Sequence, residues 1–360
     1  MNSADSFSSD YQEARGKFLS AAIEAGGALD AVAHPEPGPD GGILATDVAW
    51  FGPRDAESVL VLISGTHGIE GFCGSGAQVD WLRRGGMRER PKDVAVMMVH
   101  AINPYGFAWL RRVTQENVDL NRNWVDFSQP LPSNPHYGEL ADALCPSDWS
   151  PKTQAASAQT MRAFVEAKGE KALQQAVSGG QHTHPQGIFY GGVAPTWSRQ
   201  TQTALFAHYL GNAGRIGIID YHTGLGPWGY AERIVLDPVG SPGFDRARQW
   251  YGAAITSPSG GSSTSADIVG DGLSAARTLL AHAEVTGMAL EVGTLDSRTV
   301  INTLRADAWL HAYGDLQSEL GRAIKAEIRN AFYGDQDDWK GMVAGQSLTV
   351  IKQALAELAI

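Results

Sequence analysis

The residues best placed to do chemistry are His67 and Glu70, which stand three positions apart just after an apolar run. That run, residues 59–63, is rich in β-branched side chains and is typical of a buried strand in a parallel or mixed sheet. Open α/β sheets bind their ligands at the carboxyl ends of such strands. The pair would supply two of the three ligands of a His, His and Glu catalytic zinc site. On its own it favours a simpler interpretation, an N-capping or surface Glu beside a hydrogen-bonded loop His.

A second histidine follows another apolar run. Residues 215–220 predict a strand that ends in Asp220, and His222 comes two positions later. By strand alternation Asp220 and His222 share a face, so Asp220 can either orient the imidazole or bond the loop backbone. His222 is the third ligand that the first pair requires. The sequence therefore predicts a metal site formed by His67, Glu70 and His222.

Glu291 is an acidic residue inside an apolar strand, predicted for residues 286–294. Burying a carboxylate there is costly unless it has a partner or a purpose. A carboxylate held near a metal-activated water has the character of a general base. We therefore expect Glu291 to carry the proton transfers of a metal-assisted reaction.

A polar loop between residues 103 and 124 concentrates arginines in an otherwise acidic protein. It contains Arg111, Arg112 and Arg122. Guanidinium groups are stabilised by planar, bidentate contact with carboxylates. The carboxylate could belong to a substrate, or it could belong to Asp119 or Glu116 in a purely structural network. For any single arginine of the three, the sequence leaves both interpretations open.

Other reactive side chains carry weaker signals. His182 and His184 are one residue apart, but no acidic residue stands near them, so we expect a substrate-loop role or plain surface. Cys73 and Cys145 are the only cysteines, too few for a disulfide framework, and we expect inert thiols.

Composition limits the classes of partner. The chain has 360 residues, 43% of them hydrophobic, and a formal net charge of −11. A nucleic acid or an anionic membrane needs clustered Lys and Arg, so neither is an expected partner. Residues 1–20 lack the apolar segment of a signal peptide, and no run of about 18 apolar residues occurs. We expect a soluble, cytoplasmic protein.

Periodicity and turn residues predict alternating helices and strands. Residues 154–177 read as one long helix and residues 187–190 as a short strand, while the Gly/Ser-rich residues 257–265 are either a mobile flap or a linker. No repeat and no domain boundary is evident. We expect residues 1–360 to form a single α/β domain, with a mixed sheet of about eight strands and helices on both faces.

Taken together, these motifs resemble the zinc metallocarboxypeptidase superfamily, in order, from about residue 58 to residue 295. The predicted ligands His67, Glu70 and His222 match the zinc ligands of that superfamily, and Glu291 matches its general base. Two further motifs match it, Asn103-Pro104-Tyr105-Gly106, with Tyr105 where the family has Asp, and Asp119-Leu120-Asn121-Arg122-Asn123. The short segment between them looks more like the succinylglutamate desuccinylase and aspartoacylase branch. In that branch an Arg stands nine residues after the Asn of Asn-Pro, which selects Arg112 over Arg111.

The resemblance implies roles for individual residues. One zinc ion per chain would be bound by the predicted ligand set, with Glu291 as general base. Arg112 would stabilise the oxyanion, while Asn121 and Arg122 would bind a substrate carboxylate. The tyrosine that carboxypeptidases keep near the substrate has no motif here, although Tyr230 and Tyr251 are candidates.

The expected activity is hydrolysis of an amide bond in a small peptide or an N-acyl amino acid. A non-catalytic, metal-dependent binding protein that kept the fold is the alternative. A serine esterase is a weaker one, because no Gly-x-Ser-x-Gly elbow occurs and Gly74-Ser75-Gly76 is too short for it. The sequence does not indicate an oligomeric state.

Overall fold

The computed structural model describes residues 2–360, which form one α/β domain around a mixed sheet of eight strands. The expected fold class is confirmed. The strands are β1 (Ala28–Ala33), β2 (Ala45–Phe51), β3 (Ser58–Ile63), β4 (Val94–His100), β5 (Arg215–Thr223), β6 (Ala231–Ile234), β7 (Ile255–Thr256) and β8 (Glu284–Val292).

The sheet has a parallel centre and antiparallel flanks, in the order β1-β2-β4-β3-β5-β8-β6-β7. Strands β4, β3, β5 and β8 run parallel to one another, whereas β2 and β6 pair antiparallel with the two ends of this group. All four parallel strands therefore end at the same edge of the sheet. This is the edge at which parallel sheets keep their binding sites.

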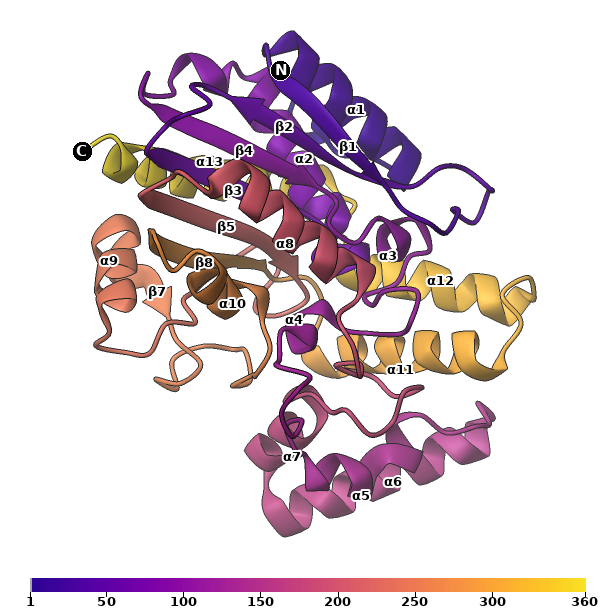
Figure 1. The fold of residues 1–360 in the computed structure, drawn as a ribbon. Helices are drawn as coiled ribbons and strands as arrows, with labels where there is room; N and C mark the ends of the chain where they lie inside the picture. Colours follow the sequence, from indigo (N-terminus) through magenta and orange to yellow (C-terminus); the bar gives the residue numbers. More distant parts are fainter. Residues whose placement is uncertain (1) are drawn as a thin grey trace.

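Helices cover both faces of the sheet (Figure 1). Helices α1, α2 and α13 pack on one face, and α8 and α10 pack on the other. The helices are α1 (Tyr11–Glu24), α2 (Gly71–Arg83), α3 (Pro104–Ala108), α4 (Leu120–Asn123), α5 (Pro135–Leu144), α6 (Pro151–Lys168), α7 (Glu170–Ser178), α8 (Trp197–Leu210), α9 (Pro242–Tyr251), α10 (Gly272–Leu279), α11 (Ser297–Tyr313), α12 (Glu319–Phe332) and α13 (Asp337–Leu358).

The alternation of side chains along β3 shows why both faces need a cover. Val59, Val61 and Ile63 belong to the core under α8, while Leu60 and Leu62 belong to the core under α2 and α13. A strand that is apolar on both faces reads as a continuous apolar run. That is the pattern by which the sequence identified β3.

Two expected elements differ in the structure. The helix expected over residues 154–177 is two helices, α6 and α7, because the chain breaks at Gly169, whose φ of 88° is open mainly to glycine. The prediction of a strand over residues 187–190 was also wrong. In this segment the described structure has only an isolated β-bridge, between Gln181 and Tyr190.

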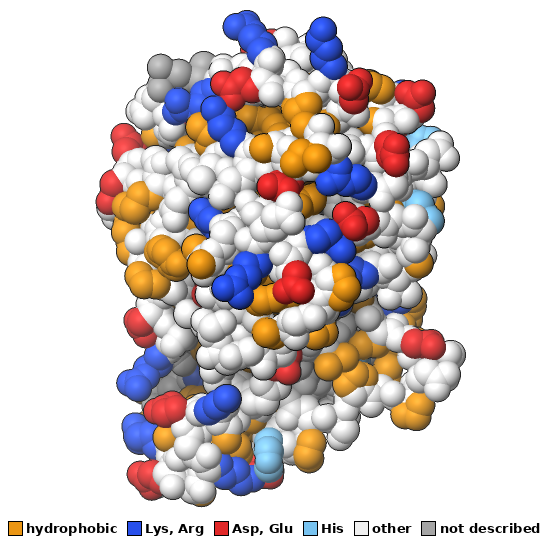
Figure 2. Space-filling model, turned by 90° about the vertical axis from the view of Figure 1, so that its left-hand side faces the viewer, with side chains coloured by type: hydrophobic (Ala, Val, Ile, Leu, Met, Phe, Trp, Pro, Cys, Tyr) orange, Lys and Arg blue, Asp and Glu red, His pale blue; other side chains and the backbone are white. Residues whose placement is uncertain are grey.

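Helices α5, α6 and α7 form a small bundle that extends away from the sheet, below α4 in Figure 1. Helices α11 and α12 lie side by side beyond the carboxyl ends of the strands. On the face shown in Figure 2, Lys and Arg side chains are interspersed with Asp and Glu side chains. Among residues 2–360, no helix combines the length and the apolar character needed to cross a membrane.

The turn that follows β3 lies against the backbone of α3. A Cβ atom added to Gly68 would lie 2.0 Å from the carbonyl carbon of Gly106, so glycine is the only residue that permits this contact. The close approach joins the turn to the segment that follows β4.

Replacing Gly68 by Ala should therefore destabilise the protein, because a backbone contact cannot move aside as a flexible side chain can. We expect the free energy of unfolding to fall by about 3 kcal/mol or more, the upper end of overpacking costs. Gly16, in the exposed interior of α1, is the matched control, since a Cβ there meets nothing within 4 Å. Gly16→Ala should raise stability by about 0.5–1 kcal/mol. Urea unfolding measures the change in the free energy of unfolding for both variants. Similar changes in the two variants would contradict the close approach at Gly68.

Candidate metal and active site

The first two predicted ligands lie in the tight turn after β3. His67 is the N-cap of a 3-10 turn, Gly68–Glu70, which runs directly into α2. Gly65, with a φ of 68°, allows the chain to reverse before this turn. Both side chains are buried, with 3% of His67 and 1% of Glu70 exposed.

The third predicted ligand and Glu291 come from neighbouring parallel strands. In the register of β3 and β5, Ile63 pairs with Asp220, so His222 projects two residues beyond the end of β3. In the register of β5 and β8, His222 pairs with Glu291. The strand pairing alone therefore places His222 and Glu291 side by side at the turn that carries the first two ligands.

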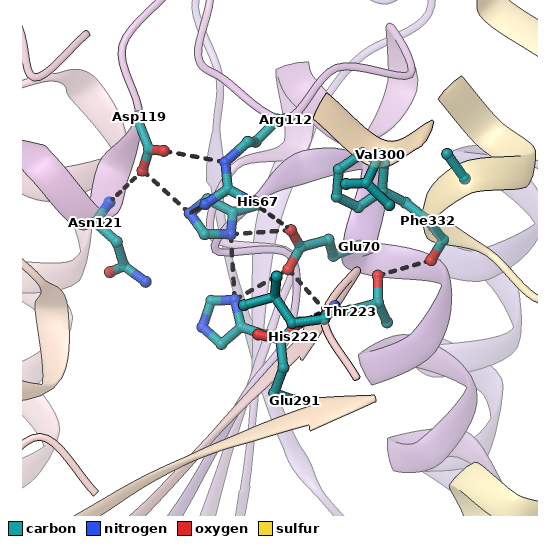
Figure 3. A network of polar contacts seen from close by, with 12 residues as sticks. His67, Glu70, Arg112, Asp119, Asn121, His222, Thr223, Glu291, Val300 and Phe332 are labelled. Carbon is teal, nitrogen blue, oxygen red and sulfur yellow. Dashed lines mark hydrogen bonds and ion pairs between the residues drawn. The ribbon is translucent and has the colours of Figure 1, made fainter. Parts of the chain in front are cut away.

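The three predicted ligands meet at one point (Figure 3). The two Nδ1 atoms of His67 and His222 are 3.2 Å apart, and Glu70 lies 3.1 Å from the first and 3.0 Å from the second. One ligand atom from each residue lies within 4.8 Å of the others. This is a group that could hold a metal ion.

Each imidazole has a carboxylate on its far side. Nε2 of His67 lies 3.1 Å from Oδ1 of Asp119, and Nε2 of His222 lies 2.9 Å from Oδ2 of Asp220. A carboxylate that accepts the Nε2 proton leaves the Nδ1 lone pair directed at the shared point, which is the tautomer that binds a metal. The donor set and its orientation therefore fit a zinc ion.

The charges around Glu70 and Glu291 give these two buried carboxyls opposite properties. Burial alone would raise the pKa of Glu70, but His67, His222 and Arg112 hold it below its usual value. Glu291 has fewer such contacts, so burial, reinforced by the charge of Glu70, raises its pKa to about 8. Its Oε1 accepts a hydrogen bond from the backbone N–H of Leu225 at 3.1 Å. Two neighbouring buried carboxyls thus have pKa values shifted in opposite directions.

Arg112 lies in the wall of the site, with its guanidinium fixed by two carboxylates. Nη1 donates to Oε1 of Glu70 at 2.8 Å, and Nε donates to Oδ2 of Asp119 at 3.0 Å. Nη2 lies 2.9 Å from Nε2 of His67. Burial opposes the charge of Arg112, but Asp119 and Glu70 raise its pKa above the usual value.

Asn121 and Arg122 come from α4, which Asp119 begins as the N-cap. Oδ1 of Asn121 accepts from the backbone N–H of Gly272 at 3.0 Å. The guanidinium of Arg122 donates to the backbone carbonyls of Asn121, at 2.9 Å, and Ser178. Its Nε is buried and has no hydrogen-bond partner among residues 2–360. Its contact with Asp119 is 3.9 Å, beyond hydrogen-bond range.

One cavity of about 110 Å³ is lined by several of these side chains, namely His67, Arg112, Asn121, Arg122, His222 and Glu291. Its two ends are chemically different. Asn121 lies on one side of the predicted ligands, and Val300 and Phe332 lie on the other (Figure 3). Arg122, the residue after Asn121, also lines the cavity. Further apolar side chains complete the lining, namely Phe189, Leu225, Ile234, Leu236, Ile268, Ala289, Ile301 and Leu304.

The loop before α10 is tied over this cavity from two sides. The carboxylate of Glu232 in β6 accepts from the backbone N–H of Thr264 at 3.2 Å, and Nε2 of Gln174 in α7 donates to the carbonyl of Thr264 at 3.0 Å. Gln175 holds the carbonyl of Asp267 at 2.9 Å. The loop is therefore anchored, and α7 contributes Gln174 to the lining.

Other residues singled out in the sequence lie elsewhere. In the described structure His182 and His184 are outside the cavity lining, with Nδ1 bonded to Gly192 O at 2.7 Å and to Thr183 Oγ1 at 2.8 Å. Tyr230 is half exposed and Tyr251 is buried. Arg111 turns away from the cavity to Asp307.

The sequence missed several residues of the site. The sequence pointed to Asp119 only as a partner for the arginines. Its place at the start of the motif Asp119-Leu120-Asn121-Arg122-Asn123 was a signal that it could also contact a predicted metal ligand. Gln174 and Phe189 had no signal, because they reach the cavity from a helical bundle and a loop far along the chain.

The fold is shared with known structures. A structure of thrombin-activatable fibrinolysis inhibitor aligns over 97% of this chain and 74% of its own, with a TM-score of 0.53 and 10% identity. Carboxypeptidase A from Helicoverpa armigera aligns over 90% and 74%, with a TM-score of 0.47 and 10% identity. An aspartoacylase family protein from Mesorhizobium loti aligns over 81% and 68%, with a TM-score of 0.38 and 13% identity.

The first of these alignments establishes the fold, and the two looser ones add nothing to it. The chain has a zinc carboxypeptidase-like fold, as the resemblance of its sequence motifs implied. It belongs to the family described as "Protein of unknown function (DUF2817)", whose profile matches residues 7–346. No curated protein matches the sequence.

The geometry predicts metal binding at the three-residue cluster. Purified protein should bind about one zinc ion per chain, and His67→Ala or His222→Ala should remove most of it. Asp220→Asn should keep the ligands but weaken zinc affinity by about 10- to 100-fold, because a neutral amide oxygen accepts from the imidazole more weakly than the carboxylate does. His182→Ala is the control and should bind zinc as the parent does. Metal analysis after dialysis gives the answer, and full zinc content in both ligand variants would rule out this site.

Proposed function

We propose that the chain is a zinc-dependent hydrolase that cleaves an amide bond in a small peptide or an N-acyl amino acid. The observation that carries this proposal is the placement of Glu291 beside a His, Glu and His cluster, in one cavity with Arg112 and Arg122. The whole chain would act as one catalytic domain. A cytoplasmic location stays a prediction from the sequence.

The proposed ligands are His67, Glu70 and His222. Two His and one Glu are the ligand set of catalytic zinc sites that keep one position open. When bound, the ion lowers the pKa of a coordinated water toward about 7 and polarises the carbonyl to be attacked. Asp119 and Asp220 would keep both imidazoles in the binding tautomer.

Glu291 would accept a proton from the attacking water and deliver it to the leaving amine. Its buried position supports this role, because burial and the charge of Glu70 raise its pKa to about 8. A general base works best when its pKa lies near the working pH. The bond from Leu225 fixes one carboxylate oxygen, which leaves the other for proton transfer.

Arg112 would stabilise the negative charge that develops on the carbonyl oxygen. Its two carboxylate partners hold the guanidinium in one plane at the cavity wall. A charge that is already oriented before the reaction costs no reorganisation when the oxyanion forms.

Arg122 and Asn121 would bind a carboxylate on the substrate. The Arg122 guanidinium is buried, yet its hydrogen bonds go to neutral backbone carbonyls and its contact with Asp119 is long. A buried charge without a hydrogen-bonded counter-ion is costly, and a substrate carboxylate would remove that cost. The ring of Phe189, 5.4 Å from the guanidinium carbon, would keep the group in place.

The direct test is a screen of zinc-loaded protein against dipeptides and N-acyl amino acids, with a chelator control. Hydrolysis that stops with the chelator and returns with zinc supports the proposal. Zinc binding without turnover of any amide would favour the alternative, a metal-dependent binding protein. Activity that survives the chelator would indicate an esterase-like mechanism instead.

Glu291→Gln should fold and bind zinc but lose about 10²-fold or more of the hydrolysis rate, because the amide cannot accept the proton. Single-turnover rates and zinc content should be measured on the same preparation. Loss of zinc together with the rate would identify Glu291 as a metal ligand. A near-normal rate would leave it only a structural role.

Arg122→Ala should mainly raise KM, because a carboxylate contact is present in both the ground state and the transition state. Such a contact is worth about 1.5–3 kcal/mol, or about ten- to hundredfold in KM. Arg122→Lys should restore part of the affinity, since it keeps the charge without the planar fork. Arg112→Ala is the comparison and should lower kcat and kcat/KM together.

Amidated substrates provide the control for this assignment. A substrate whose carboxylate is an amide should bind the parent and Arg122→Ala with similar KM. Equal losses for the free acid and the amide would show that Arg122 does not bind a carboxylate.

A further inference from the structure

The turn that carries the predicted ligands His67 and Glu70 is bonded to the backbone of Arg111 and Arg112. The N–H of Gly68 donates to the carbonyl of Arg112 at 3.1 Å, and the N–H of Ile69 donates to the carbonyl of Arg111 at 2.8 Å. Because these two amides lie between His67 and Glu70, the placement of both ligand side chains depends on where residues 111 and 112 are held.

The chain reaches these residues through a strained conformation. Leu110 has a φ of 51°, in the left-handed region that residues other than glycine rarely adopt. Such strain persists only where the surrounding structure holds it in place. Lys325, in α12, donates from Nζ to the carbonyl of Trp109 at 2.9 Å and lies 3.4 Å from the carbonyl of Leu110.

Arg111 and Lys325 share one carboxylate, that of Asp307 in α11. Nε of Arg111 donates to Oδ2 of Asp307 at 3.1 Å, and Lys325 bonds to Oδ1. Asp307 and Arg111 are each only 3% exposed. His311 also contacts Lys325, at 2.7 Å. Burial opposes ionisation of Asp307, but Lys325 and Arg111 lower its pKa to about 2, so it stays charged.

Arg111 and Arg112 therefore point in opposite directions from one short segment. Arg111 is fixed on the outer side, between Asp307 and Oδ1 of Asn117 at 2.8 Å. Arg112 is fixed on the inner side, against Glu70 and Asp119. The segment cannot rotate without breaking ionic contacts on both sides.

We propose that Asp307 is a positioning residue for the metal site. Through Arg111 and Lys325 it holds residues 110–112 in place, and these residues in turn hold the turn that carries His67 and Glu70. Asp307 is neither one of the residues that line the cavity nor one of the predicted ligands. Without its charge, two buried cations would lose their shared anion, which is strongly unfavourable. The segment would relax, and the two amide bonds to the turn would weaken. The part of this inference that concerns zinc rests on the proposed function, while the part that concerns the turn does not.

The test compares Asp307→Asn with Asp47→Asn. Asp47 is the matched control, because it is also a buried carboxylate in an ion pair, with Arg15 at 2.7 and 3.0 Å, but it joins α1 to β2 away from the cavity. Both variants should lower the unfolding temperature. Only Asp307→Asn should speed hydrogen exchange at the amides of Gly68 and Ile69, by about tenfold in metal-free protein. It should also weaken zinc affinity by about tenfold or more, measured by chelator competition.

Asp307→Glu should restore part of both losses, since it keeps the charge. If Asp307→Asn does not fold, Arg111→Lys replaces it, because lysine keeps the charge but cannot reach Asp307 and Asn117 together. Unchanged exchange at the turn in the folded variant, or equal changes in Asp47→Asn, would overturn the proposal. If the parent hydrolyses no amide, the proposed function fails, but the exchange measurement in metal-free protein still decides the role of Asp307.

Discussion

The parallel pairing of β3, β5 and β8 is the constraint on which the rest of the site depends. Because the three strands end at one edge, their registers set the distance between the turn after β3, His222 on β5 and Glu291 on β8. A shift of one residue in either register would turn His222 or Glu291 to the opposite face. The apolar run of each strand, buried on both faces, is what opposes such a shift.

The site also depends on a balance of charges among buried side chains. Four carboxylates, those of Glu70, Asp119, Asp220 and Glu291, are buried close to two imidazoles and two arginines. Each of the first three is bonded to an arginine or a histidine side chain, whereas Glu291 is bonded, among residues 2–360, only to the backbone N–H of Leu225. This difference in neighbours, not in residue type, lowers the pKa of Glu70 and raises that of Glu291.

The cavity is lined by segments far apart in the chain. Glu232 on the sheet and Gln174 on α7 both hold Thr264, so the loop before α10 joins the sheet to the helical bundle. The carboxylate-binding end proposed for Arg122 lies under the same bundle, through Ser178.

The sequence by itself predicted strands β3, β5 and β8 and placed His67, Glu70, His222 and Glu291 in or just after them, because apolar runs and the residues that follow them are local properties of the chain. It did not show the break at Gly169, since a helical pattern continues on both sides of that residue. It also assigned Asp119 to the arginines alone. Only the tertiary structure showed that Asp119 contacts His67, that Arg111 turns outward to Asp307, and that α7 covers the cavity. Those contacts join residues 52 to 196 positions apart, and their distances and charges exist only when the strands and helices are packed.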